Sequence, residues 1–278
     1  MKQIVLLWMM VCTGWMASAQ TTDSVIVLNG NRSFQLQKQI PGSFSYLNVD
    51  ILGNIYLLQQ NSRLVKYNSN GDSLAVFNEV RKFGTPTLID VSNPLKTIVF
   101  YKSYGTVVVL DRFLSQRSSL DLRKQQVFMP ACVANSYDNQ LWIFDAQEFK
   151  LKKFSDDGTL LQESTDLRLM IDSMPAPTQL FDSENLVYCY DPANGFFIFD
   201  YYGGWKNQLP FKNWQQVFVS GKQIYGIVDN ELQAYSIGSL QLRHYPLPES
   251  IRHATTVLGR QGRLYVLTEA GVDIYGLP

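Results

Sequence analysis

The stretch from Asp50 to Gly71 contains a pattern of apolar and polar positions that recurs through the rest of the chain. It reads DILGNIYLLQQNSRLVKYNSNG, in which a polar turn precedes the apolar run Ile55–Leu58 and a second polar break precedes Leu64–Tyr67. Short apolar runs bounded by Gly, Asn, Asp and Ser are typical of β-strands joined in a hairpin. The stretch therefore predicts a β-hairpin with loops at both ends.

Five further copies of this hairpin follow along the chain. Positions equivalent to Tyr56 in its first strand recur every 37 to 46 residues, at Val99, Trp142, Tyr188, Tyr225 and Tyr265. Positions equivalent to Tyr67 in its second strand come 10 to 12 residues after the first marker, at Leu110, Phe154, Phe199, Tyr235 and Tyr275. A strand-like run precedes every copy and another follows several of them, and four strands in about 40–45 residues make one blade of a β-propeller. The mature chain has no long stripe of apolar residues with the 3.6-residue period of a helix, so we predict an all-β fold: a single six-bladed β-propeller of four-stranded antiparallel blades.

The last copy indicates how the ring closes. It ends at Pro278 directly after its third strand, whereas the N-terminal region has two spare strand-like runs, Val25–Leu28 and Phe34–Gln39. We expect one of these N-terminal strands to complete the last blade, because closure pairs the backbone groups of an open edge and joins both ends of the chain. The sequence leaves open which of the two it is.

The first residues of the chain resemble an export signal. A basic Lys2, the apolar run Ile4–Val11 and the small residues Ala17-Ser18-Ala19 predict a secretory signal peptide over residues 1–19, followed by a propeller domain over residues 20–278. A membrane anchor is the weaker interpretation, because a spanning helix needs about 20 apolar residues. We therefore expect an exported protein, periplasmic or associated with the outer membrane, that is not an integral membrane protein.

The charge of the chain argues against two classes of partner, and its cysteines bear on disulfide formation. The chain has 24 basic and 24 acidic side chains and no basic run, which argues against nucleic acid and against an anionic membrane as partners. Beyond the signal peptide, Cys132 and Cys189 each lie in an apolar stretch, which favours two buried thiols. A disulfide between them stays an open alternative in an oxidising compartment.

Two resemblances support the fold prediction. The Asp50–Gly71 stretch resembles the NHL-type propeller repeat, in which a D-x-x-G-N-[IL]-[YW] strand precedes a strand ending in an aromatic residue and a Gly turn; Tyr137–Gly158 matches nearly as well, and the other four copies match by pattern only. Asp90–Arg112 and Leu141–Phe144 are similar to small secreted six-bladed propellers of Gram-negative envelopes, among them the plug-type propeller subunit of the type nine secretion translocon. These resemblances imply a fold and an envelope setting but no activity, since propellers include hydrolases, lyases and binding scaffolds.

Residues for catalysis are sparse. The only histidines are His244 and His253, no Cys/His spacing suits zinc, and no nucleophile motif is present, so we predict no catalytic, cofactor-binding or metal-binding residues and no cofactor. The motifs Asn68–Asp72 and Asp156–Thr159 favour ordinary turns over calcium or sialidase-type sites. Asp50 and Asp90 lie near the expected channel and could form a catalytic pair, but capping of the strand-connecting turns is the favoured interpretation.

Aromatic residues outside the strand markers suggest an interface. Those that fall in expected loops can anchor a partner, since binding energy concentrates in a few such side chains. We predict partner binding through the face that carries the long loops, with Tyr104, Phe149, Tyr202 and Trp205 as candidate contacts. The predicted function is a secreted or periplasmic non-catalytic scaffold, a monomeric domain within a complex, that binds an envelope protein such as a secretion translocon. The alternative is a propeller hydrolase or lyase that acts on a sugar or lactone in the central channel.

Overall fold

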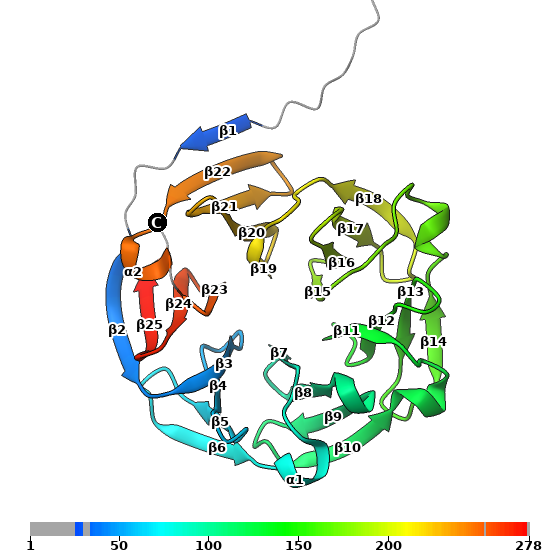
Figure 1. The fold of residues 1–278 in the computed structure, drawn as a ribbon, viewed down its shortest axis with the longest axis horizontal. Coiled ribbons are helices and arrows are strands. Elements are labelled where there is room, and N and C mark those ends of the chain that lie inside the picture. Colours follow the sequence, from blue (N-terminus) through cyan, green and yellow to red (C-terminus); the bar gives the residue numbers. More distant parts are fainter. Residues whose placement is uncertain (1–25, 30–33, 253, 277–278) are drawn as a thin grey trace, which may run out of the picture.

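Six β-sheets form a ring around a central channel (Figure 1). The computed structural model describes residues 26–29, 34–252 and 254–276. Each sheet is one blade with four antiparallel strands in order from the channel outward, and one blade has a further, parallel strand at its outer edge. The predicted all-β six-bladed propeller is thereby confirmed. The predicted signal peptide lies outside the described residues.

The strands of the first three blades follow the chain in order. Blade one consists of β3 (Phe44–Val49), β4 (Ile55–Gln59), β5 (Leu64–Tyr67) and β6 (Ser73–Phe77). Blade two consists of β7 (Leu88–Asn93), β8 (Lys96–Tyr101), β9 (Thr106–Asp111) and β10 (Gln116–Asp121). Blade three consists of β11 (Pro130–Asn135), β12 (Leu141–Asp145), β13 (Lys150–Phe154) and β14 (Leu160–Glu163).

The last three blades include the N-terminal strands. Blade four consists of β15 (Gln179–Ser183), β16 (Leu186–Asp191), β17 (Gly195–Phe199) and β18 (Trp205–Leu209). Blade five consists of β19 (Gln215–Ser220), β20 (Gln223–Val228), β21 (Glu231–Ser236) and β22 (Gln241–Pro246), with β1 (Ile26–Asn29) as a fifth strand. Blade six consists of β23 (Thr256–Arg260), β24 (Arg263–Thr268), β25 (Gly271–Gly276) and β2 (Gln35–Pro41).

The sequence markers fall where the hairpin pattern predicts. Every residue equivalent to Tyr56 lies in the second strand of its blade, and every residue equivalent to Tyr67 lies in the third. In blades one to four these strands are the most buried, because neighbouring blades pack on both of their sides. In β4, for example, every residue except Gln59 is buried. A run that is apolar on both faces is therefore a property of the middle strands of a blade.

The ring closes through β2. This strand pairs antiparallel with β25, from Gln35 opposite Gly276 to Pro41 opposite Gly271, and supplies the outer strand that blade six lacks (Figure 1). The prediction of closure by an N-terminal strand is confirmed. The other N-terminal strand, β1, runs parallel to β22 on the outside of blade five.

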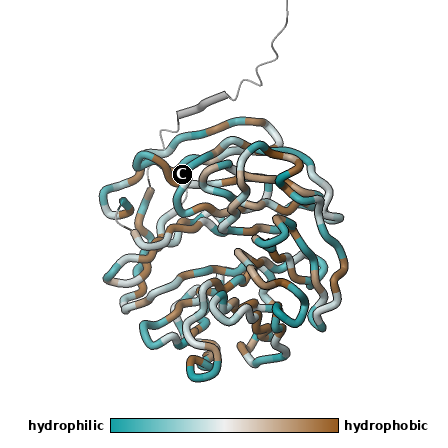
Figure 2. The backbone as a smooth tube through the Cα atoms, turned by 45° about the vertical axis from the view of Figure 1, so that its right-hand side comes forward, coloured by the Kyte–Doolittle hydropathy of each residue, from teal (hydrophilic) through white to brown (hydrophobic). Residues whose placement is uncertain are grey.

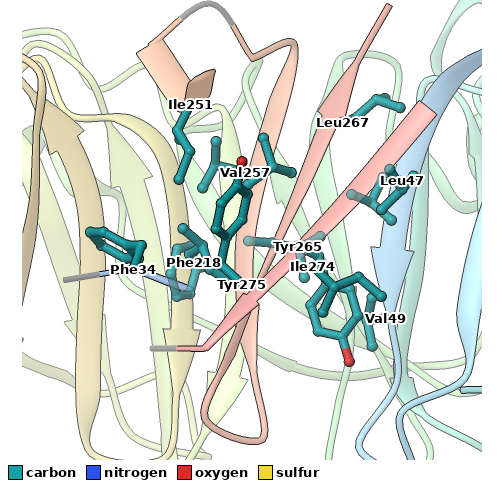
Figure 3. Close-up of a cluster of buried hydrophobic side chains, with 14 of the residues drawn as sticks. Phe34, Leu47, Val49, Phe218, Ile251, Val257, Tyr265, Leu267, Ile274 and Tyr275 are labelled. Atoms are coloured by element: carbon teal, nitrogen blue, oxygen red, sulfur yellow. The ribbon is translucent and has the colours of Figure 1, made fainter. Parts of the chain in front are cut away.

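Apolar side chains fill the spaces between neighbouring blades. Along the chain, hydrophobic stretches alternate with hydrophilic positions (Figure 2). At the closing seam, Leu47 of β3, Phe218 of β19 and Val257 of β23 belong to one buried cluster that also includes Phe34 (Figure 3). Burying such a side chain contributes about 1.5–3 kcal/mol to the free energy of folding. Because the cluster combines Phe34 with residues of β3 and β23, it stabilises the packing of the first blade against the last.

The two faces of the ring carry different connections. Because the strands alternate in direction, the loops between second and third strands share one face with the connections between blades, and we call this the loop-rich face. It carries five short helices: α1 (Val80–Phe83), η1 (Lys102–Tyr104), η2 (Leu122–Gln125), η3 (Leu167–Leu169) and α2 (Glu249–Arg252). The opposite face carries the short turns between first and second and between third and fourth strands, and we call it the turn face. None of the helices that the structure describes is long and apolar enough to cross a membrane.

Candidate functional site

The central channel is a hollow that runs between the innermost strands of the blades. Its volume is about 660 Å³, and it is lined by the inner strands of all six blades. Toward the loop-rich face, its polar lining is uncharged, with Thr87, Thr178, Gln179 and Gln216. Toward the turn face it is charged, with Asp90, Asp182, Glu184 and Arg260. A channel of this size can hold a small ligand, so its polar groups need individual description.

Most of these polar side chains are already bonded to the neighbouring blade. Tyr46 Oη and Asn48 Nδ2 donate to the carbonyl of Ile89, at 3.0 and 2.7 Å. Further bonds join the remaining blades around the ring: Asn135 N to Asp90, Ser136 Oγ to Asp182, Ser183 Oγ to the carbonyl of Gly221, and Gln216 Nε2 to the carbonyl of Thr255. The channel lining therefore acts as a set of bridges between blades.

Arg260 joins three blades at the closing seam. Its guanidinium donates from Nη1 to the carbonyl of Val219 in blade five at 2.8 Å, and from Nε to the carbonyl of Val49 in blade one at 3.4 Å. Burial lowers the pKa of Arg260, and the carboxylates of Asp90 and Asp50 partly oppose that shift. Arg260 thus holds blades five, six and one together.

The channel carboxylates cap turns and bridge blades. Asp50 is fully buried and accepts bonds from the backbone N–H groups of Leu52 and Asn54, both at 2.9 Å, as the favoured capping interpretation predicts. Asp90 accepts from Ser92 N at 2.7 Å and from Asn135 N at 2.6 Å. Asp50 is therefore fixed in its own turn, and both oxygens of Asp90 accept backbone N–H groups, one of them from blade three.

Asp182 is a channel carboxylate whose pKa is raised. Removal from water raises its pKa, and this shift is opposed by donation from Tyr137 N, Ser136 Oγ and Trp142 Nε1. The Trp142 bond measures 3.1 Å and crosses from blade three to blade four. Because three donors of the neighbouring blade point at one oxygen, the carboxylate is best explained as a bridge.

The other sequence motifs serve locally. His244 lies on the outer strand β22, where Nδ1 is 2.8 Å from a carboxylate oxygen of Glu231, and His253 lies outside the described residues. Asn68 Oδ1 accepts from Asn70 N and Asp72 N within one turn. Among the residues described, no group of three or more His, Cys, Asp and Glu side chains is arranged to hold a metal ion.

The predicted contacts Tyr104 and Phe149 lie on the loop-rich face but differ in exposure. Tyr104, in η1 of blade two, is 55% exposed. Phe149 is half-buried against the cluster between blades three and four, and the guanidinium of Arg168 lies 4.5 Å from its ring centroid. Tyr104 is therefore accessible to a partner, whereas Phe149 supports the loop around it.

Tyr202 and Trp205 were predicted on the loop-rich face, but they lie on the turn face. Both belong to the connection from β17 into β18, which opens on the turn face. Tyr202 is 77% exposed there, while the ring of Trp205 packs at 5.6 Å from that of Phe199 and at 5.8 Å from that of Phe197. The four candidates thus do not form one surface, because third-to-fourth-strand turns and second-to-third-strand loops lie at opposite ends of a blade.

The structure instead exposes a group of apolar side chains between blades two and four of the loop-rich face. We call this group the apolar loop surface; it consists of Phe128, Met129, Leu169, Met170 and Met174. Leu169 is 76% exposed, Met174 66% and Phe128 57%. Sequence reasoning placed their connections on this face but missed the residues, although apolar side chains between strands were a usable signal.

Backbone bonds join the loops that carry the apolar loop surface. Ala146 N donates to the carbonyl of Met129, and Leu167 N donates to the carbonyl of Phe149, both at 2.9 Å. Asn194 Nδ2 in blade four is 3.5 Å from the carbonyl of Met174. The connections before and after blade three are therefore held side by side against the loops of blades three and four.

The turn face also exposes apolar residues, but as separate turn tips. Leu52 and Phe113 each lie two residues after an aspartate. The side chain of that aspartate, Asp50 or Asp111, accepts a hydrogen bond from their backbone N–H, at 2.9 and 2.8 Å. Tyr202 has the same relation to Asp200, at 3.0 Å. Their exposure follows from the local turn, which makes them suitable controls.

The two cysteines are buried free thiols. Cys132 and Cys189 both belong to the cluster between blades three and four. Burial raises the pKa of both thiols, so the thiolate that reacts with oxidants or metals is disfavoured. The favoured interpretation of two buried thiols agrees with this arrangement.

Comparisons with known proteins support the fold. No protein-family model matches the chain, and no curated protein matches it. Among solved structures, a streptogramin B lyase aligns with a TM-score of 0.57 at 15% identity, covering 84% of this chain and 78% of that one. The Pan2 WD40 domain of Neurospora crassa aligns with a TM-score of 0.59 at 9% identity, covering 85% and 90%. The Cps50 (Swd1) β-propeller domain of Myceliophteria thermophila aligns with a TM-score of 0.60 at 11% identity, covering 88% and 100%. Since such low identities indicate shape alone, the chain is a six-bladed β-propeller whose structural neighbours include both a lyase and a WD40 domain.

Proposed function

We propose that the protein is an exported, non-catalytic scaffold that binds an envelope protein through its loop-rich face. The observation that carries this proposal is the apolar loop surface, where five large apolar side chains are exposed within connected loops. Exposed apolar groups gathered in this way mark interaction sites, and methionine adapts well to a partner's shape.

The charged groups of the channel favour this function over an enzyme. Asp90, Asp182 and Arg260 are bonded to neighbouring blades. A lyase or hydrolase needs an acid or base within reach of a bound ligand, and the described histidine, His244, is on an outer strand. The resemblance of Asp90–Arg112 and Leu141–Phe144 to plug-type propellers makes a component of a secretion translocon the first partner to test.

The test compares two triple variants of equal charge. Phe128→Asn, Leu169→Asn and Met174→Asn remove the apolar loop surface, and Leu52→Asn, Leu95→Asn and Phe113→Asn remove three comparably exposed side chains from the turn face. Each tagged protein is recovered from crosslinked native envelopes, and bound proteins are quantified by mass spectrometry.

We expect the first variant to lose a specific partner and the second to retain it. Loss of one anchor often costs about 2 kcal/mol or more, so three should reduce recovery by well over tenfold. Equal recovery by both folded variants would show that the binding surface lies elsewhere. Turnover of a sugar or lactone by the pure protein would favour the enzyme alternative.

A further inference from the structure

Cations gather on one part of the loop-rich face, although the formal net charge of the protein is zero. The loops of blades one and two on the loop-rich face, residues 60–63, 78–87, 102–105 and 122–129, contain six cations and one carboxylate, Glu79. We call the six cations the basic sector: Arg63, Arg81, Lys82, Lys102, Arg123 and Lys124. All six are exposed.

The turn face of blades one to four has the opposite sign. Its turns carry seven carboxylates and one cation, Arg112. The carboxylates are Asp50, Asp72, Asp138, Asp156, Asp157, Glu184 and Asp200. Several of them cap their own turns, so the acidic character of this face follows from turn chemistry, whereas the basic sector has no such local cause.

The loops of the basic sector contact one another. Ser62 Oγ lies 2.9 Å from Thr85 Oγ1, and Lys102 N donates to Thr87 Oγ1 at 3.3 Å. Arg123 Nη2 is 3.4 Å from the carbonyl of Ser103, which joins η2 to η1. The six cations therefore belong to one connected surface rather than to unrelated loops.

These cations have no acidic partner within the described chain. None of the six takes part in an ion pair there, whereas Arg168 and Arg252 on the same face pair with Asp166 and Glu249. Six unpaired cations on one connected surface repel each other, and an acidic partner removes that repulsion. The missing counter-charge points to a ligand from outside the chain.

The basic sector adjoins the apolar loop surface. Lys124 and Phe128 belong to the same connection between β10 and β11, four residues apart. Tyr104 lies within the basic sector, since its ring is close to Gly84 and its loop is bonded to η2. A partner that covers Phe128 and Met129 therefore also comes within reach of Lys124.

We propose that the basic sector binds an acidic segment of the protein partner that covers the apolar loop surface. This inference rests on the proposed function and adds the chemistry of the partner. Carboxylates matched to exposed cations mainly speed and orient docking, while the apolar contacts provide most of the affinity.

A lipid surface fits these groups less well than a protein. Asp166 and Asp172 lie in the connection that carries Leu169, Met170 and Met174, and Glu148 lies in the adjoining loop of blade three. An anionic membrane pressed against the apolar loop surface would meet these carboxylates, which is unfavourable. A protein can place its acidic segment over blades one and two alone and leave blades three and four to apolar contacts.

The test uses defined probes and charge-matched variants of the exported protein. A fluorescein-labelled Glu-Gly repeat peptide, a Lys-Gly repeat peptide and vesicles of phosphatidylglycerol and phosphatidylcholine are titrated with the protein. One variant carries Arg81→Glu, Lys102→Glu and Lys124→Glu; the control carries Lys206→Glu, Lys222→Glu and Arg263→Glu, exposed cations near the turn face. Both variants have the same net charge.

We expect the Glu-Gly peptide to bind the wild type and the control variant with similar affinity. Its affinity for the first variant should be lower by about tenfold or more. The affinity of the peptide should fall as the salt concentration is raised, because the Debye length decreases to about 10 Å at 0.1 M ionic strength. Absence of Glu-Gly binding, equal weakening in both variants, or stronger binding of the Lys-Gly peptide would each overturn the proposal. Binding to the vesicles without binding to the Glu-Gly peptide would overturn it in favour of a membrane.

Partner recovery separates this inference from the proposed function. If the Asn variant of the apolar loop surface loses the partner but the Glu variant of the basic sector keeps it, the scaffold function stands and the acidic partner segment does not. If both variants keep the partner, the proposed function itself fails. Loss in both variants, with the control variant unaffected, supports both.

Discussion

Arg260 provides a direct test of the structural role of the channel lining. Replacing it with methionine keeps much of the side-chain volume but removes the donors to the carbonyls of Val219 and Val49. A hydrogen bond from a charged donor contributes about 1.5–3 kcal/mol; the 2.8 Å bond to Val219 counts fully and the 3.4 Å bond to Val49 only weakly. We therefore expect Arg260→Met to lower the free energy of unfolding by about 2 kcal/mol.

Urea unfolding followed by tryptophan fluorescence measures this loss, provided that the m-value is unchanged. Arg263 is the matched control, because it pairs with Arg260 across the turn between β23 and β24 but is exposed. Arg263→Met should stay within about 0.5 kcal/mol of the wild type. Arg260→Lys tests geometry at constant charge and should recover little, since an ammonium group cannot reach both carbonyls as the planar fork does. If Arg260→Met and Arg263→Met are equally stable, the guanidinium does not hold the closing seam.

Three further outcomes test other parts of the structure. A chain that begins at Phe34 retains β2 and should remain a soluble monomer by size-exclusion chromatography, whereas one that begins at Gly42 exposes the edge of β25 and should aggregate; equal behaviour would refute closure by β2. Gly195→Ala should cost about 3 kcal/mol or more in urea unfolding, because its φ is +88° and a Cβ would come within 2.1 Å of a backbone oxygen. Gly221→Ala, with φ at +58° and no atom within 4 Å, should cost only about 1 kcal/mol, and similar costs at the two sites would contradict the steric argument. Because burial raises the pKa of the two buried cysteine thiols, they should resist a thiol reagent at mildly alkaline pH and react fully in denaturant, and fast labelling of the native protein would contradict their burial.

The candidate site was harder to predict than the fold. The loop-rich face could be deduced from strand order, and Tyr104 was correctly placed on it. Exposure could not be deduced, because it depends on how side chains pack: Arg168 from the next connection covers Phe149, and Phe199 of the paired strand covers Trp205. The hydrogen bonds that Asp90 and Asp182 accept from the neighbouring blade could likewise not be deduced from the sequence, since their donors lie 40 to 45 residues away.

The sequence by itself determined the number of blades, the middle strands of each blade and the closing of the ring by an N-terminal strand. These features depend on local alternation and on turn residues such as Asp50, whose capping acts within a few residues of the chain. Only the tertiary structure decided which N-terminal strand closes blade six, which loop side chains stay exposed, and that the cations of blades one and two gather on one surface. Those features depend on which blades and loops are neighbours in space, and they involve residues that are far apart along the chain.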